Sequence, residues 1–365
     1  MNTLRRLAIV HALIVFVSIC SLPVASAQPA PAADASKPRV QLVATGGTIS
    51  NREGGRLTGE DLIRLIPDVE RYAKVGVEQF SNVASSQLTL EQYLALSRRI
   101  NELLRGDREL SGVVVTMGTD TMEELAYFLH LTVRDERPVV VVGAMRNASQ
   151  IGYEGPANLL EGIRVAADPG ARGMGTMVVL NDEINSAREV TKTDARRLHT
   201  FQSRGYGVLG VIDNDRVAWY RRTIKRHSAT SEFDVFAIKA LPRVDVLMVY
   251  QDAPGDLIKA AVDNGAKGVV LATAGGGATS GTQFEGMLYA AQKQVFVVSS
   301  TRTGGGRIWP FQGPMPAGAP PEFVARRAFL LASEDLLPVK SRLLLMLGLA
   351  TTTDRDQLQR MFGEY

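Results

Sequence analysis

Cysteine is almost absent from this sequence. Cys20 is the only one among 365 residues, and it lies in an N-terminal segment that we expect to be removed. The remaining chain can then form neither a disulfide nor a thiolate nucleophile. Its stability has to come from packing.

Histidine is also scarce, which argues against a metal site. Beyond the N-terminal segment only His130, His199 and His227 remain, far apart in the sequence and without a cysteine to assist them. A structural or catalytic zinc ion needs three or four ligands of this kind, usually at short spacings. We therefore expect no metal.

The charge balance excludes another class of partner. The formal net charge of the chain is +3, and removal of residues 1–27, which carry Arg5 and Arg6 and no acidic residue, takes it to 3 − 2 = +1. A nearly neutral chain has no basic surface to attract nucleic acid or anionic membrane. We expect neither as a partner.

The first 27 residues have the features of a secretory signal peptide. Arg5 and Arg6 precede an apolar run, Leu7 to Val24, which ends in Ala25-Ser26-Ala27. A basic start, a short apolar run and a small-residue cleavage site are typical of exported proteins. We expect a secreted protein, periplasmic if the source has an outer membrane, whose residues 28–38 form a disordered lead-in.

The rest of the chain alternates short β-branched runs with helical periodicity, which predicts an α/β fold with a mostly parallel sheet. Continuous apolar runs suit strands that are covered on both faces. The expected strands are Val40 to Ala44, Val113 to Thr116, Val139 to Val142, Met177 to Leu180, Val244 to Tyr250, Gly268 to Thr273 and Gln294 to Ser299. The length suggests a larger N-terminal domain (39–221), a linker (222–243) and a smaller C-terminal α/β domain (244–365).

Two helices and one hairpin have local signals. Thr89 with Gln92, and Thr121 with Glu124, each form the Ser/Thr-x-x-Glu/Gln pattern of a capping box. The first predicts a helix ending near Gly106 and the second a helix that begins directly after a strand. Two short apolar runs around Asn214-Asp215 predict a hairpin.

Threonine-rich loops follow two of the predicted strands. Thr45-Gly46-Gly47-Thr48-Ile49 comes after the first strand, and Met117-Gly118-Thr119-Asp120-Thr121 separates the second from its capped helix. Open α/β sheets place ligands at the carboxyl ends of their strands. Glycines let a backbone approach a ligand closely, and a helix amino terminus favours anionic groups.

These two loops resemble the signatures of the bacterial-type L-asparaginase family. The likeness continues through Gly143-Ala144-Met145-Arg146, Gly155-Pro156, Val190-Thr191-Lys192-Thr193 and Tyr206-Gly207. It covers nearly the whole chain after the leader. The resemblance implies an exported, type II-like amidohydrolase that acts on a small-molecule amide, needs no cofactor and forms a homotetramer.

The resemblance also implies roles for individual residues. Thr48 would be the nucleophile that forms an acyl-enzyme, with Thr119 as a second threonine, Lys192 as the base and Asp120 as its orienting partner. The implied substrate-binding residues are Ser86 with Gln87, the neighbouring Ser85 as an alternative register, Gly47, Gly118, Thr119 and Asp120. A threonine hydroxyl needs such a base because it is otherwise a poor nucleophile.

Three departures from the family pattern bear on the substrate. Met117 stands where the family usually has histidine, and the lid from Asn51 to Gly59 has Leu57 near the place of the family's activating tyrosine. The loops Ala274 to Ser280 and Thr301 to Pro310 lack the residues that would recognise the substrate amino group. L-asparagine is the substrate that the resemblance implies. The departures favour the alternatives, which are L-glutamine, another amide, or a catalytically silent amino-acid-binding role.

Overall fold

The computed structural model describes residues 37–311, 313, 315 and 317–365. The expected signal peptide, and all of the lead-in before Lys37, lie outside this part of the chain. Among the described residues no helix is both long and apolar enough to cross a membrane.

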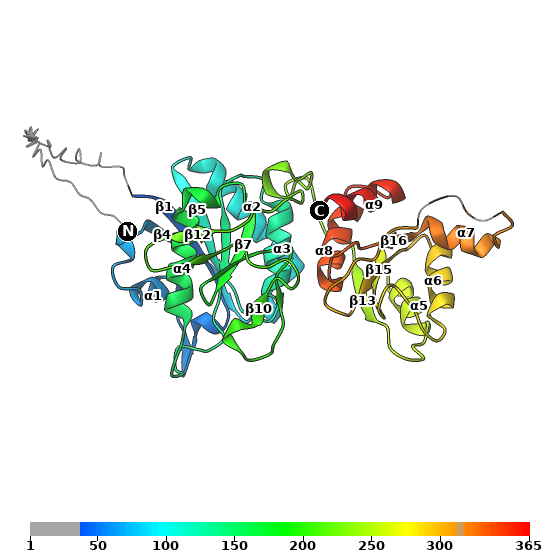
Figure 1. Ribbon diagram of the computed structural model, residues 1–365, viewed down its shortest axis with the longest axis horizontal. Coiled ribbons are helices and arrows are strands. Elements are labelled where there is room, and N and C mark those ends of the chain that lie inside the picture. The colour runs from blue at the N-terminus through cyan, green and yellow to red at the C-terminus, as the bar shows by residue number, and fades with distance from the viewer. Residues whose placement is uncertain (1–36, 312, 314, 316) are drawn as a thin grey trace, which may run out of the picture. The chain divides into compact units, whose positions relative to one another are not determined.

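The N-terminal part is built on one large sheet, in which five strands run parallel and three are antiparallel (Figure 1). The strand order is β12 (Val217–Trp219), β11 (Gly210–Ile212), β8 (Glu183–Ser186), β7 (Thr176–Leu180), β6 (Val139–Val142), β5 (Leu110–Thr116), β1 (Arg39–Gly46) and β4 (Lys74–Val83). The strands β11 and β12 form the predicted hairpin.

Both faces of this sheet are covered, which explains why its strands are apolar without alternation. On β5, Val113 and Val115 belong to a cluster with helices α2 (Leu90–Gly106) and α3 (Met122–Thr132). Val114 points to the other face, where α1 (Gly59–Arg64) and α4 (Gly155–Ala167) pack. The capping box at Thr89 is formed as predicted.

The C-terminal part repeats the same plan on a smaller scale, as expected. Its parallel sheet has the order β13 (Val244–Met248), β14 (Gly268–Thr273), β15 (Phe296–Thr301) and β16 (Leu330–Ala332). One face packs against α5 (Asp256–Asp263) and α6 (Gln283–Gln292), and the other against α8 (Pro338–Leu349). Helices α7 (Pro321–Ala328) and α9 (Arg355–Glu364) lie at its margins (Figure 1).

Two features of the fold differ from the sequence-based expectation. The ten-residue strand β4 had not been predicted, because it lies at the sheet edge and its residues alternate polar and apolar instead of forming an apolar run. The capping box at Thr121 was wrong: its side chain makes no cap hydrogen bond, and its backbone (φ −123°, ψ 20°) is not extended. A carboxylate oxygen of Glu124 lies instead 3.6 Å from a guanidinium nitrogen of Arg342.

Candidate active site

The first threonine loop leaves β1 through a conformation that only glycine adopts readily. Gly47 has φ 86° and ψ −170°, and its amide donates to the carbonyl of Val83 at 2.9 Å. Thr45 is buried, and its hydroxyl donates to the carbonyl of Thr116 at 2.6 Å. Thr48 opens the short turn Thr48–Ser50, half-buried, and its hydroxyl has no hydrogen-bond partner among the described residues.

The second threonine loop touches the first through its backbone. A Cβ atom built on Gly47 would lie 2.2 Å from the amide nitrogen of Gly118, so only a glycine at position 47 allows this approach. Thr48 and Thr119, each the next residue in its loop, are thereby placed in neighbouring loops at the carboxyl edge of the sheet. The two sequence motifs are one structural unit.

A third segment reaches the same place from β4. This strand ends at Val83, and Ser85 follows it into a short turn, Ser85–Gln87. Ser85 is buried, and its hydroxyl would lie 2.8 Å from a Cβ on Gly118. Ser86 and Gln87 are exposed. Of the two registers left open by the sequence, the geometry brings Ser85 against the glycine loops.

Lys192 completes the cluster from a distant part of the chain. It lies on β9 (Thr191–Lys192), which pairs with β10 (Phe201–Gln202). Its ammonium donates to the hydroxyl of Thr119 at 3.0 Å and to a carboxylate oxygen of Asp120 at 2.7 Å. The lysine side chain is 15% exposed, whereas that of Asp120 is 76% exposed. Thr119, only 4% exposed, is therefore bonded to a lysine at the edge of solvent.

Two residues of this region had not been singled out from the sequence. A carboxylate oxygen of Glu123 accepts from the hydroxyl of Thr191 at 3.0 Å and from the amide of Lys192 at 3.3 Å. Glu123 stands inside the second motif, so the sequence indicates that it lies near the site but not which groups it bonds.

Tyr153 is the other missed residue, and it lies next to the turn of Thr48. Its hydroxyl donates to the carbonyl of Ile49 at 2.5 Å, and burial raises the pKa of the Tyr153 phenol above its usual value. No local pattern marks this tyrosine. It anchors the backbone directly after Thr48.

The expected lid is a small hairpin of β2 (Asn51–Arg52) and β3 (Gly55–Arg56). The loop before α4 holds its base, since the amide of Ala148 donates to the carbonyl of Asn51 at 2.8 Å. Leu57 is buried in the apolar cluster beneath α1 and α4. Its side chain thus serves packing and offers no polar group to the site.

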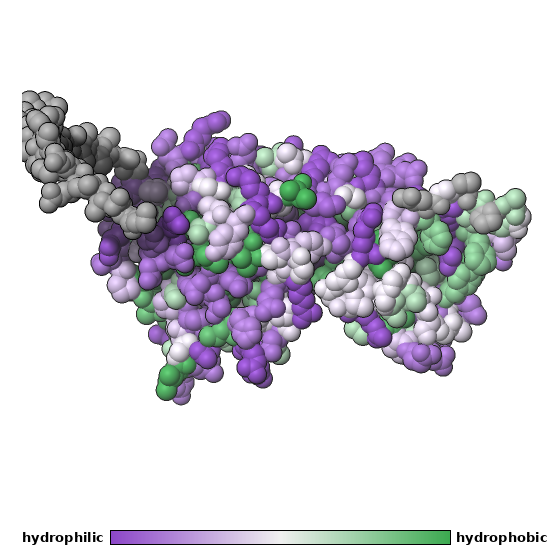
Figure 2. Space-filling model, in the orientation of Figure 1, coloured by the Kyte–Doolittle hydropathy of each residue, from purple (hydrophilic) through white to green (hydrophobic). Residues whose placement is uncertain are grey.

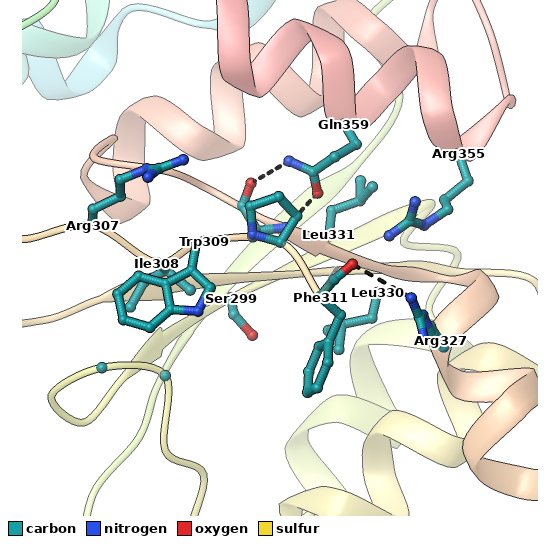
Figure 3. Close-up of a pocket in the computed structure, with 14 residues that line it drawn as sticks. Ser299, Arg307, Ile308, Trp309, Phe311, Arg327, Leu330, Leu331, Arg355 and Gln359 are labelled. Atoms are coloured by element: carbon teal, nitrogen blue, oxygen red, sulfur yellow. Dashed lines mark hydrogen bonds between the residues drawn. The ribbon is translucent and has the colours of Figure 1, made fainter. Parts of the chain in front are cut away.

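A large cavity lies elsewhere, in the C-terminal part. It has about 630 Å³ and is lined by exposed Trp309 and Phe311 and by arginines that include Arg327 and Arg355 (Figure 3). None of the threonine, lysine or aspartate side chains described above borders it. Within the part of the chain that the structure describes, no group of three or more His, Cys, Asp or Glu side chains could hold a metal ion.

Comparison with known families gives two matches that together span most of the chain. Residues 39–225 match the family model "Asparaginase, N-terminal", and residues 243–362 match "Glutaminase/Asparaginase C-terminal domain". The boundary between these matches falls between the two sheets.

Individual proteins resemble this chain over nearly their whole length. L-asparaginase 2 of Bacillus subtilis is 41% identical over 338 residues, covering 90% of this chain and 87% of that protein. The probable periplasmic L-asparaginase of Haemophilus influenzae is 35% identical, with 91% and 94% covered. The crystal structure of a probable cytoplasmic L-asparaginase from Campylobacter jejuni has a TM-score of 0.82 and 35% identity, and covers 90% of this chain and 100% of its own.

Proposed function

Because this chain belongs to the asparaginase family and is an amidohydrolase of the L-asparaginase type, we propose that it is an exported enzyme that hydrolyses L-asparagine through a threonine acyl-enzyme. The products are L-aspartate and ammonia. The observation that carries this proposal is the contact of the Lys192 ammonium with the Thr119 hydroxyl and the Asp120 carboxylate, at 3.0 and 2.7 Å. These groups stand beside the loop of Thr48.

In the first half of the reaction, the hydroxyl oxygen of Thr48 attacks the side-chain amide carbon of the substrate. The C–N bond then breaks, ammonia leaves with the proton it needs, and an ester joins Thr48 to the aspartyl group. In the second half, water attacks this ester and regenerates the hydroxyl. A positioned donor and acceptor are needed at each step, because a neutral hydroxyl is a weak nucleophile and an amide nitrogen is a poor leaving group.

The proton transfers in both steps fall to Thr119, Asp120 and Lys192. The Thr119 hydroxyl is bonded to Lys192, so a proton taken by the lysine can pass through one hydrogen bond. Asp120 is largely exposed and can accept the cationic amino group of an amino acid.

Substrate recognition falls to the backbone loops and to the serine beside them. Gly47 and Gly118 hold the loops close together, because a Cβ atom on either would collide with the neighbouring segment. Ser85, buried against Gly118, can donate to the substrate carboxylate. The exposed Ser86 and Gln87 border the same turn.

The proposal also covers compartment, assembly and domains. The leader 1–27 supports export, and one relative is named periplasmic, although the similar solved structure is titled cytoplasmic. We propose two domains, 39–221 and 244–365, joined by 222–243. Trp309, Phe311 and Phe323 are exposed, and Figure 2 shows apolar surface at the end of the molecule that carries α7. Such surface supports a contact with other subunits of a homotetramer.

Ammonia release from purified protein tests the function. We expect turnover of L-asparagine, and a loss of at least about a hundredfold in Thr48→Val, which removes the hydroxyl at nearly constant volume. Thr193→Val is the matched control: residue 193 directly follows Lys192, but its hydroxyl bonds only the carbonyl of Thr200, at 2.8 Å. Equal activity of wild type and Thr48→Val would move the nucleophile to Thr119.

The replacement of the lid tyrosine by Leu57 is the reason to test a second substrate class. This leucine stands where the resemblance places the family's lid tyrosine, and it is buried in the core, so position 57 supplies no hydroxyl to the site. A panel of L-glutamine, D-asparagine and N-substituted amides separates the alternatives. Strong turnover of one of these with none of L-asparagine would replace the proposed substrate, and binding without ammonia from any amide would leave a silent binding protein.

A further inference from the structure

Lys340 is a buried cation with an unusual set of partners. It lies on α8 in the C-terminal part, and its side chain has no exposed surface. Its ammonium donates to the carbonyl of Arg188 at 3.0 Å and to the carbonyl of Val190. Burial lowers the pKa of Lys340 to about 8, so the group is still charged at neutral pH.

These two carbonyls directly precede the strand that carries Lys192. Val190 is followed by Thr191 and Lys192 without any intervening residue. A buried ammonium is costly unless it is fully hydrogen-bonded, so the carbonyls have to stay where the ammonium is. The C-terminal part of the chain therefore restrains the backbone just before the proposed base.

Glu123 restrains the same segment, through the side chain of Thr191 and the backbone amide of Lys192. It accepts from the side chain of Thr191 and from the backbone amide of Lys192, and its second carboxylate oxygen is buried without a partner among the described residues. Glu123 stands in the first turn of α3, three residues after Asp120. Helices α3 and α8 pack against each other (Figure 1). The strand of Lys192 is thus bonded to both.

We propose that Lys340 is a positioning residue for the reaction, which acts with Glu123 as a charged clamp on residues 188–192 and holds the Lys192 amine within reach of the Thr119 hydroxyl. This inference rests on the proposed function of Lys192. Its physical basis is that a misplacement of about 1 Å in a reacting group can cost about a hundredfold in rate. The C-terminal part of the chain then contributes to the geometry of a site to which it supplies no reacting atom.

The test compares Lys340→Met with Leu345→Ala. Methionine keeps most of the buried volume and removes the ammonium. Leu345 is also buried on α8, where its side chain packs beside Gly268 of β14 and makes no hydrogen bond to residues 188–190. It therefore reports the effect of a destabilised α8 alone. Thermal unfolding establishes that both variants fold and how much each has lost.

We expect Lys340→Met to lower kcat about ten- to a hundredfold while KM changes less than about threefold, because the loops of Gly47 and Gly118 are untouched. Leu345→Ala keeps kcat at the wild-type value. If Lys340→Met keeps its kcat, or loses no more than an equally destabilised Leu345→Ala, the positioning role is refuted. Should Lys340→Met fail to fold, Glu123→Ala, at a partly exposed position, tests the clamp from α3 with the same two expectations.

Amide hydrogen exchange gives a readout that does not need activity. We expect faster exchange in the peptide that contains residues 188–193 of Lys340→Met, and wild-type exchange there in Leu345→Ala. Unchanged exchange in Lys340→Met overturns the inference. A wild-type protein that releases no ammonia from any amide would instead overturn the proposed function, and the exchange result would still decide whether the clamp exists.

Discussion

The close approach of the two glycine loops can be tested with Gly47→Ala. The new methyl group would lie 2.2 Å from the amide nitrogen and 2.3 Å from the Cα atom of Gly118. Both atoms belong to backbone, so no flexible side chain can move aside. We expect the loops to be pushed apart, and with them Thr48 and Thr119.

The loss of stability expected for Gly47→Ala has two parts. A non-glycine residue at φ 86° and ψ −170° costs about 1–3 kcal/mol in backbone strain, and overpacking a tight contact costs about 1–3 kcal/mol more. The free energy of unfolding should therefore fall by about 2–6 kcal/mol. Natural domains have about 5–15 kcal/mol, so the variant is expected to fold with reduced stability and with little activity.

Gly54→Ala is the matched control. Gly54 also has a positive φ, 75°, but a Cβ built there meets nothing within 4 Å. Gly54→Ala should lose only the backbone part of the free energy of unfolding, about 1–3 kcal/mol. Urea unfolding and ammonia release are measured for both variants. If Gly47→Ala unfolds at the same urea concentration as Gly54→Ala and hydrolyses amide at the wild-type rate, the contact between the loops is refuted.

Three further outcomes follow from single side chains. Tyr153→Phe removes the hydrogen bond to Ile49, so unfolding measurements should show a loss of about 1 kcal/mol, and kcat should fall because the turn after Thr48 is freed; an unchanged kcat would deny Tyr153 this role. Leu57→Tyr should destabilise the protein by about 1–3 kcal/mol without raising kcat, since the leucine is packed in the core; a gain in kcat would show that position 57 faces the substrate. His130 and His227 stack with their rings 4.7 Å apart, and burial lowers the pKa of both. Below about pH 6.5 the unfolded chain therefore binds more protons than the folded one, and the free energy of unfolding should fall as the pH drops. A His130→Phe variant that keeps the wild-type acid sensitivity would contradict this.

The strands and the two threonine loops could be predicted because their signals are local. A strand covered on both faces needs an unbroken apolar run, and such runs marked β1, β5, β6 and β7 without any knowledge of their neighbours. The strand β4 was missed for the opposite reason. It lies at the edge, and its alternating residues resemble those of an ordinary surface segment.

The family resemblance identified more residues of the site than hydrophobic periodicity could. It singled out Thr119, Asp120 and Lys192, whose side chains the structure brings together. It left the choice between Ser85 and Ser86 open, since one step along the chain changes neither residue type nor motif. The structure buries Ser85 against a backbone on another loop and exposes Ser86, and the choice of the substrate-binding serine stays a prediction.

The sequence alone thus determined which apolar runs become strands, which loops follow them, and that two of these loops carry threonine and glycine. These properties depend on neighbours within a few residues. Only the tertiary structure decided that Lys192 reaches a threonine 73 residues away, that Tyr153 anchors Ile49, and that a buried Lys340 holds the backbone before Lys192. Such contacts depend on the packing of helices against sheets. No local pattern records which side chain a distant backbone will meet.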